Sequence, residues 1–385
     1  MATNNNDKTL NVPPLRFPEF SGEWEEEQLD SIATLSKGIG ISKEQLSEDG
    51  EPCILYGELY TKYKSEIIKQ VESKTDIDCS KLKRSKANDV IIPCSGETAV
   101  DIATARCVPF DNILLGGDLN IISLHKYDGA FMSYQLNGKR KYDIARVAQG
   151  VSVVHLYGEH LKAIKTYNPS LPEQQKIAKL LSLIDERIAT QNKIIEDLKK
   201  LKSAIRKKIF SLLKDEYTKS FEINQLLDYE QPTAYIVAND EYSTDTRLTP
   251  VLTANKGFIL GYTDEKNGIY QKGACIIFDD FTMDAKYVSF PFKVKSSAIK
   301  ILTAKPNVNL RFMFEYLSHW ELKSEEHKRH YISEISPLVI ELPSKEKQNI
   351  IALLMTSLNN KLTIEEKAKI RYEVQKGYLL SQMFI

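Results

Sequence analysis

The chain has 385 residues, of which 42% are hydrophobic and 27% charged, so it is long enough to bury the cores of two or three domains. Lysine plus arginine and aspartate plus glutamate each number 52, and this net charge of zero excludes an argument for nucleic-acid binding from bulk electrostatics. No apolar run approaches the roughly 18 residues of a membrane span, and the polar start lacks the apolar core of a signal peptide, which favours neither a membrane-spanning nor a secreted protein.

The N-terminal part of the chain is predicted to be a flexible polar tail, residues 1–14, followed by a first domain, residues 15–167. The domain opens with aromatic anchors in LRFPEFSGEWEEEQL. Short apolar runs follow, each ended by Gly or Asp: PCILYGELYT, DVIIPCSGE and DNILLGGDLNIISL. Such punctuated runs are typical of strands joined by turns.

Two basic clusters lie in this domain. KLKRSK, Lys81 to Lys86, is interpreted as a solvated loop. GKRKY places Lys139, Arg140, Lys141 and Tyr142 together near the end of the domain. Cations can meet DNA phosphates and a tyrosine ring can pack on a sugar or base, so these four residues are candidate DNA contacts. A solvated basic turn with a packed tyrosine explains them equally well.

A single long helix is predicted next, within residues 168–215. Ser170 is suited to cap it and Pro172 to its first turn. Apolar residues recur at spacings of three and four, interrupted by Gln191 and Lys202, which is the rhythm of a coiled coil. A helix of about 37 residues extends roughly 55 Å, so its seam needs a partner helix, unless it lies in an ordinary bundle. The predicted seam residues are Leu181, Ile184, Ile188, Ile195, Leu198 and Ile205.

The second domain, residues 216–337, is again predicted to be rich in strands, from runs such as TPVLTANKGFILGYT and GIYQKGACIIFDDFT. Its interior shows no visible match to the first domain. HKRHY repeats the basic triplet with tyrosine, and it adds Lys328, Arg329, His330 and Tyr331 to the candidate DNA contacts. The acidic residues of IFDDFTMD are interpreted as turn residues at a strand end rather than as a metal site.

The last segment, residues 338–385, repeats the long helix. Gln175 aligns with Gln348 and Leu181 with Leu354; after a slip of one residue, Ile184 aligns with Leu358 and Phe210 with Phe384. Such an internal repeat determines the architecture. The seam of this helix is predicted to contain Leu354, Leu358, Leu362, Tyr372 and Leu379.

The predicted fold is therefore α+β: two globular α/β domains separated by two long helices. To share a seam the helices must run antiparallel, as a coiled coil, with the two domains related by an approximate two-fold axis. The helix pair would act as a spacer of fixed length.

No catalytic or metal-binding arrangement is recognised in the sequence. There is no GxxxxGK[ST] loop for ATP and no glycine-rich loop after a strand for an adenosyl cofactor. The five cysteines form no CxxC pair or Cys/His cluster, which indicates reduced thiols in a cytoplasmic protein. We therefore predict no catalytic residue, no metal site and no cofactor of its own.

Three segments resemble the specificity subunit of type I restriction-modification systems, the HsdS family: LRFPEFSGEWEEEQL, SLPEQQKIAKLLSLIDERI and KGYLLSQMF. The resemblance covers nearly the whole chain, but LPSKEKQNIIALL departs from the Glu-Gln-Gln pattern at the entry to the last helix. It implies two target recognition domains, each reading one half of a bipartite, asymmetric DNA sequence, on a scaffold that is not itself catalytic.

The resemblance also implies partners. Such subunits bind double-stranded DNA, two modification (methyltransferase) subunits and restriction (endonuclease and translocase) subunits, and S-adenosylmethionine, ATP and Mg²⁺ are expected on those partners. Two other interpretations stay open: a self-contained DNA methyltransferase or nuclease, and a coiled-coil interaction protein that binds no DNA.

Overall fold

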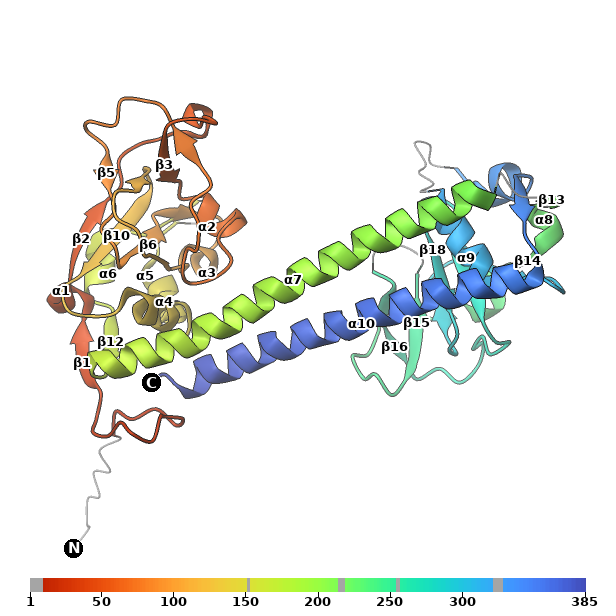
Figure 1. Ribbon diagram of the computed structural model, residues 1–385. Helices are drawn as coiled ribbons and strands as arrows, with labels where there is room; N and C mark the ends of the chain where they lie inside the picture. The colour runs from red at the N-terminus through yellow and green to blue at the C-terminus, as the bar shows by residue number, and fades with distance from the viewer. Residues whose placement is uncertain (1–9, 151–152, 214–218, 254–256, 321–327) are drawn as a thin grey trace, which may run out of the picture. The chain divides into compact units, whose positions relative to one another are not determined.

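The computed structural model describes residues 10–150, 153–213, 219–253, 257–320 and 328–385, and the chain divides into two compact units (Figure 1). The first unit comprises Met1–Asn192 together with Lys367–Ile385, and the second comprises Lys193–Glu366. Each unit contains one mixed α/β domain and one segment of each of two long helices. Among the described residues, no helix is both long and apolar enough to cross a membrane.

The first domain is built from short strands and helices in an alternating order. Before the long helix these elements are β1 (Glu25–Gln28), α1 (Leu29–Ile32), β2 (Ala33–Lys37), η1 (Lys43–Gln45), β3 (Glu51–Ile54), α2 (Glu58–Thr61), β4 (Lys74–Thr75), β5 (Lys83–Arg84), β6 (Asp89–Pro93), β7 (Ser95–Gly96), α3 (Ala99–Ile102), β8 (Arg106–Val108), β9 (Leu114–Leu115), β10 (Leu119–Leu124), α4 (Gly129–Asn137), α5 (Lys141–Val147), β11 (Val154–His155), α6 (Gly158–Lys162) and β12 (Lys165–Asn168).

The core of this domain lies on both faces of an antiparallel sheet with the order β2-β10-β6-β8. Strand β6 is buried along its whole length, because both of its faces are covered. Val90 and Ile92 pack with Met132 of α4 on one face, whereas Ile91 faces a second cluster around Leu59. This alternation follows from the two-residue period of a strand.

The described elements of the second domain lie between the two long helices. They are β13 (Lys219–Glu222), α8 (Ile223–Leu226), β14 (Leu227–Glu230), η2 (Pro232–Tyr235), β15 (Thr249–Leu252), β16 (Ile259–Thr263), β17 (Cys275–Asp279), β18 (Ala285–Val288), β19 (Lys293–Val294), β20 (Ile299–Ala304), α9 (Leu310–His319), the π-helix η3 (Tyr331–Ile335) and β21 (Val339–Leu342). Asp279 accepts hydrogen bonds from the backbone N–H groups of Phe281 and Thr282, which is the turn role predicted for it.

The two domains share one topology, which corrects the expectation that only the helices repeat. The sheet order β14-β20-β17-β18 matches β2-β10-β6-β8, and the pair β13–β21 matches β1–β12. The parallel pair β15–β19 likewise matches β3–β9. Different apolar side chains fill equivalent positions on the same backbone plan, so the repeat is not visible in the sequence.

The two long helices are α7 (Leu171–Leu213), of 43 residues, and α10 (Lys345–Gln382), of 38 residues. Gln174 fixes the start of α7: its Nε2 donates to the Pro169 carbonyl at 2.8 Å, and its Oε1 accepts from the Asp128 N–H at 2.9 Å. Gln348 makes the same two bonds at the start of α10, to the Pro343 carbonyl and from the Asn309 N–H.

These paired glutamines correct the register of the internal repeat. Gln174, not Gln175, is equivalent to Gln348, so the two helices align at a constant offset and no slip is needed. The same offset brings Leu181 onto Met355, and both side chains are fully buried. Each glutamine therefore ties the segment just before its long helix to the residue that caps a domain helix, Asp128 of α4 or Asn309 of α9.

Candidate nucleic-acid interface and helix pair

In the first unit, the beginning of α7 packs against the end of α10. Leu181 of α7 and Phe384, just beyond α10, belong to one buried cluster with Trp24 and Phe131. The rings of Phe131 and Phe384 lie 5.2 Å apart between centroids. The Arg187 guanidinium lies 6.0 Å from the centroid of the Tyr372 ring, which continues the contact between the helices.

In the second unit, the end of α7 packs against the beginning of α10. Phe210 of α7 shares a cluster with Ile351 and Met355 of α10. Its ring lies 5.7 Å from that of Phe312 in α9. In each unit, early residues of one helix meet late residues of the other, which establishes the predicted antiparallel pairing.

Tyr372 contacts Arg187 of α7, and Ile205 and Leu358 pack against the cluster of the second unit that contains Phe210 and Met355. Five further predicted seam residues are buried or half-buried, and their seam role stays a prediction: Ile184, Ile188, Ile195, Leu198 and Leu362. Leu181 and Leu379 pack in the same cluster of the first unit. Leu354 is a correction. Its side chain is 42% exposed, whereas its neighbour Met355 is fully buried, because the shifted register turns Met355 toward the domain.

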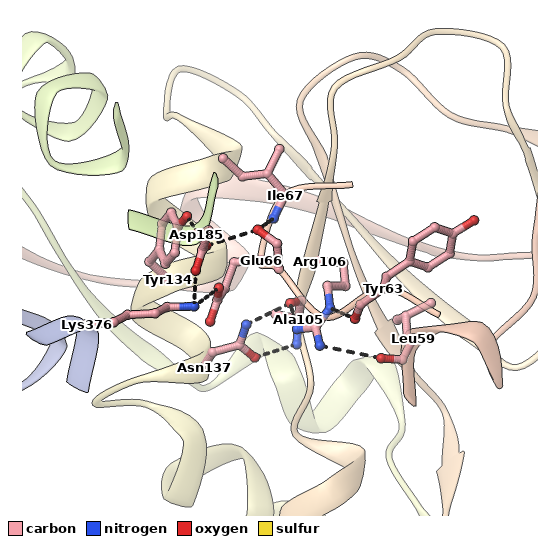
Figure 2. Close-up of polar contacts among 11 residues, drawn as sticks. Leu59, Tyr63, Glu66, Ile67, Ala105, Arg106, Tyr134, Asn137, Asp185 and Lys376 are labelled. Atoms are coloured by element: carbon pink, nitrogen blue, oxygen red, sulfur yellow. Dashed lines mark hydrogen bonds and ion pairs between the residues drawn. The ribbon is translucent and has the colours of Figure 1, made fainter. Parts of the chain in front are cut away.

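A buried ion-pair cluster joins both helices to the first domain (Figure 2). Lys376 Nζ on α10 lies 2.6 Å from Asp185 Oδ1 on α7 and 2.5 Å from Glu66 Oε2 of the domain. Tyr134 of α4 donates its hydroxyl to Asp185 Oδ2 at 2.7 Å, and Ser65 donates to the same oxygen at 3.0 Å. One ammonium thus bridges two carboxylates from separate elements.

The charges in this cluster shift one another's ionisation. Burial raises the pKa of the Glu66 carboxyl, against the attraction of Lys376. Burial alone lowers the pKa of Lys376, but the two carboxylates outweigh it, and the pKa of the ammonium is raised. Burial, with the Asp185 carboxylate, also raises the pKa of the Tyr134 phenol. The cluster is therefore a largely buried junction in which one ammonium serves two carboxylates.

The second unit has an equivalent junction with other residues. Arg206 of α7 holds the fully buried Glu315 of α9 through Nε at 3.0 Å and Nη2 at 2.7 Å. Asn359 of α10 donates its amide to the other Glu315 oxygen at 3.3 Å. Burial lowers the pKa of the neighbouring Lys202. Sequence reasoning missed both junctions. Lys202, which interrupts the apolar rhythm, lies beside the second junction and was a signal for that one alone.

The two predicted basic triplets lie at equivalent places in the two domains, after α4 and after α9. Lys139 and Tyr142 are exposed. Arg140 instead turns inward, where Nη2 donates to the carbonyl of Ile385 at 3.0 Å and the guanidinium lies 5.3 Å from the Tyr167 ring centroid. Lys141 is half-buried at the start of α5.

In the second domain, Lys328 and Arg329 are exposed, and the Arg329 guanidinium lies 5.9 Å from the Phe281 ring centroid. His330 and Tyr331 differ from the expectation. Both are buried, and Tyr331 belongs to the domain core, so its ring is not presented for stacking on a base. The π-helix that begins at Tyr331 turns this residue inward.

The fold defines a class of protein: one chain that carries the same α+β domain twice, each copy followed by a long helix. The chain matches the model of the type I restriction modification DNA specificity domain over residues 21–200 and again over 215–374, and it therefore belongs to that family. The predicted family and its two-domain architecture are confirmed.

The chain is 39% identical over 178 residues to the EcoR124I/EcoR124II specificity subunit of Escherichia coli. This match covers 41% of the chain and 43% of that relative, so it spans less than half of the relative's length. A putative MjaX specificity subunit of Methanocaldococcus jannaschii is 23% identical over 97% of the chain and 96% of the relative.

Among solved structures, the S subunit of a type I system from M. genitalium has the same fold. It superposes with a TM-score of 0.67 at 17% identity, covering 97% of this chain and 99% of that one. A chain from a study of complex assembly and conformational transition in a type I system gives a TM-score of 0.54 at 12% identity, covering 96% of this chain and 99% of that chain.

Proposed function

We propose that the chain reads a bipartite, asymmetric DNA target for a type I restriction-modification complex, with one half-site for each domain. The observation that carries this proposal is the repeated topology with unlike side chains. A common fold offers DNA the same docking geometry twice, and unlike side chains at equivalent positions read different bases.

Equivalent strands illustrate this difference. Thr34 and Ser36 on β2 stand where β14 has Asp228 and Glu230, since each strand follows an equivalent short helix. Hydroxyls can donate or accept hydrogen bonds, whereas carboxylates only accept, so the two domains carry different polar groups at equivalent places. Such differences support two unlike half-sites and therefore an asymmetric target.

We further propose that the helix pair binds two modification subunits, and that restriction subunits join the assembly through them. Exposed apolar residues lie on the outer surface of both helices. On α7, Leu183, Ile194, Leu201 and Leu212 are separated by 11, 7 and 11 residues, which places them on one helical face. On α10, Ile350, Leu353, Ile364 and Tyr378 are each more than half exposed.

The reactive chemistry belongs to those partners in this proposal. S-adenosylmethionine would bind the modification subunits, and ATP with Mg²⁺ the restriction subunits. The chain itself contributes recognition and placement. Its role then depends on the complementarity of its two domains to DNA in charge and shape, and on burial of the apolar helix faces by the modification subunits.

Sequencing of methylated adenines in cells that carry the chain with its modification subunits tests this function. We expect methylation at a two-part sequence with an unread gap, which disappears when the chain is deleted. Purified chain incubated alone with DNA and S-adenosylmethionine, or with Mg²⁺, should leave the DNA unchanged. Methylation or cleavage by the chain alone would instead support a self-contained enzyme.

A further inference from the structure

A polar hollow of about 370 Å³ opens on the surface of the first domain. It lies among β2, β5, the turn before β6, and the end of β10. This is where the basic cluster Lys81 to Lys86 is found; the sequence suggested a solvated loop, but part of the cluster forms strand β5. The polar side chains that line the hollow are Thr34, Ser36, Lys83, Arg84, Lys86, Asn88, Asp89, Ser123 and His125.

The lysines of the hollow have no acidic partner. Among the described residues, the ammonium groups of Lys83, Lys86 and the nearby Lys81 make no hydrogen bond or ion pair. Arg84 differs, because both of its terminal nitrogens bind Glu51, at 2.5 and 2.8 Å. Two cations are therefore free to attract an anion at this place.

One carboxylate, Asp89, lies at the floor of the hollow, but its oxygens are already occupied. Asp89 Oδ1 accepts from the Ser123 hydroxyl at 2.7 Å, and Oδ2 accepts from the backbone N–H of Lys86 at 2.8 Å. The residue is 3% exposed. Asp89 thus holds the Lys86 backbone in place, and the two lysines leave the hollow with a net positive charge.

The remaining donors suit an acceptor-only ligand. The Thr34 hydroxyl lies 3.0 Å from His125 Nε2 at the rim, and Ser36 is on the same strand. Lysine, serine and threonine side chains are the groups that proteins commonly direct at the phosphate oxygens of DNA. The hollow has no Phe, Tyr or Trp among its lining residues, so it lacks a large ring that would stack on a base.

The equivalent region of the second domain shows that the fold does not require this hollow. There, Asp228 and Glu230 replace Thr34 and Ser36, and each is paired: Asp228 with Lys305 at 3.5 Å, and Glu230 with Lys272 at 2.8 Å. The same topology is stable with neutralised charges at this place. The unpaired lysines of the first domain therefore serve no shared packing role.

We propose that this hollow binds one backbone phosphate of the DNA duplex that the first domain reads, with Lys83 and Lys86 as the cations. This assignment rests on the proposed function. A phosphate contact fixes the register of the domain on the duplex and carries no base preference. With a phosphate bound in the hollow, the bases of the first half-site would lie against the domain surface beside β2 and β5.

The test compares the double variant Lys83→Ala/Lys86→Ala with wild type, each as the full chain assembled with its modification subunits. Binding to the target duplex and to a scrambled duplex is measured across a salt series. We expect both affinities to fall by the same factor, and the slope of log K against log salt to become less negative by about 0.9, the value for one lost phosphate. Lys83→Arg/Lys86→Arg should retain the wild-type slope.

A matched control is Lys162→Ala, which removes a half-exposed lysine of the same unit that pairs with Glu159 at 3.0 Å. It should leave the slope unchanged. Duplexes with a single neutral methylphosphonate then locate the contact. One position should weaken binding by wild type and have no effect on the double alanine variant.

The outcomes separate the inference from the function on which it rests. If the double alanine variant keeps the wild-type slope and the same methylphosphonate profile, the phosphate site is wrong while DNA reading stands. If wild type does not distinguish its target from the scrambled duplex, the proposed function fails and this inference fails with it.

Discussion

Lys376 on α10 and Asp185 on α7 form an ion pair, with Nζ 2.6 Å from Oδ1, although the two residues are far apart in the sequence. Their side chains are 16% and 6% exposed. The second carboxylate, from Glu66, makes this pair the place where the first domain and both helices are joined. We therefore expect substitutions at this junction to lower the stability of the first unit.

Replacing Lys376 with alanine should destabilise the first unit by about 3 kcal/mol or more, because it leaves two mostly buried carboxylates without a cation. Trp24 lies in the first unit and Trp320 in the second, so Trp24 fluorescence in a Trp320→Phe background reports denaturant unfolding of the first unit alone. Lys369→Ala, a more exposed lysine of the same helix, should cost under about 1 kcal/mol. If the two variants lost the same free energy of unfolding, Lys376 would not have the stabilising role assigned to it here.

Replacing Phe384 with alanine should destabilise the first unit by about 3–5 kcal/mol, since the ring is fully buried between Trp24 and Phe131. The same substitution at Phe210 should act on the second unit in its place. Val374→Ala is the control, because that side chain is 66% exposed. Hydrogen exchange resolved by peptide assigns each loss to its unit. Loss of protection in the second unit upon Phe384→Ala would count against the assignment.

The stability of the first unit should fall at alkaline pH through its buried thiols. Burial raises the pKa of Cys53 and of Cys94 from 9.0 to about 11. The unfolded thiols lose their protons first, so the unfolded state binds fewer protons and the free energy of unfolding decreases as pH rises from 9 towards 11. Below pH 9 this contribution is fully present.

The double variant Cys53→Ala/Cys94→Ala should show a shallower decline over this pH range, whatever its stability at neutral pH. Denaturant unfolding followed by Trp24 at several pH values measures the slope. A decline as steep as that of wild type would show that other groups are responsible.

Deleting seven residues from each of α7 and α10 should shorten the unread gap of the target and leave both half-sites unchanged. Seven residues keep the apolar seam in phase and remove about 10 Å of helix, or roughly three base pairs. Methylation mapping of the double deletion measures the gap. Methylation at the original gap length would contradict a spacer role for the helices.

The architecture was predicted well from the sequence, because long-range periodicity and the internal repeat of the helix segments indicate the two long helices directly. The shared topology of the domains was not predicted, since short strands of different apolar residues can form the same sheet. Leu354 was assigned to the seam because its apolar character alone does not show which way it faces. Adjacent leucines such as Leu353 and Leu354 do not show which side chain faces inward, and Met355 was not considered.

The candidate contacts were harder to predict than the fold. A basic triplet looks the same whether its arginine meets a phosphate or, like Arg140, a carbonyl of the last residue in the chain. Tyr331 is buried because of a π-helix, for which the sequence has no recognisable signal. Lys83 and Lys86 gain their significance from an absence of partners that only the folded domain reveals.

Exchange of the first domain tests the central claim most directly. Because β1 and β12 pair with each other, residues 25–168 can be replaced as one piece by the corresponding domain of a relative with a different target. Methylated-adenine sequencing of cells that express the hybrid with its modification subunits should return a new first half-site, an unchanged gap and the original second half-site. If methylation persists with both halves altered, or with neither altered, the two domains do not read DNA independently and the account is wrong.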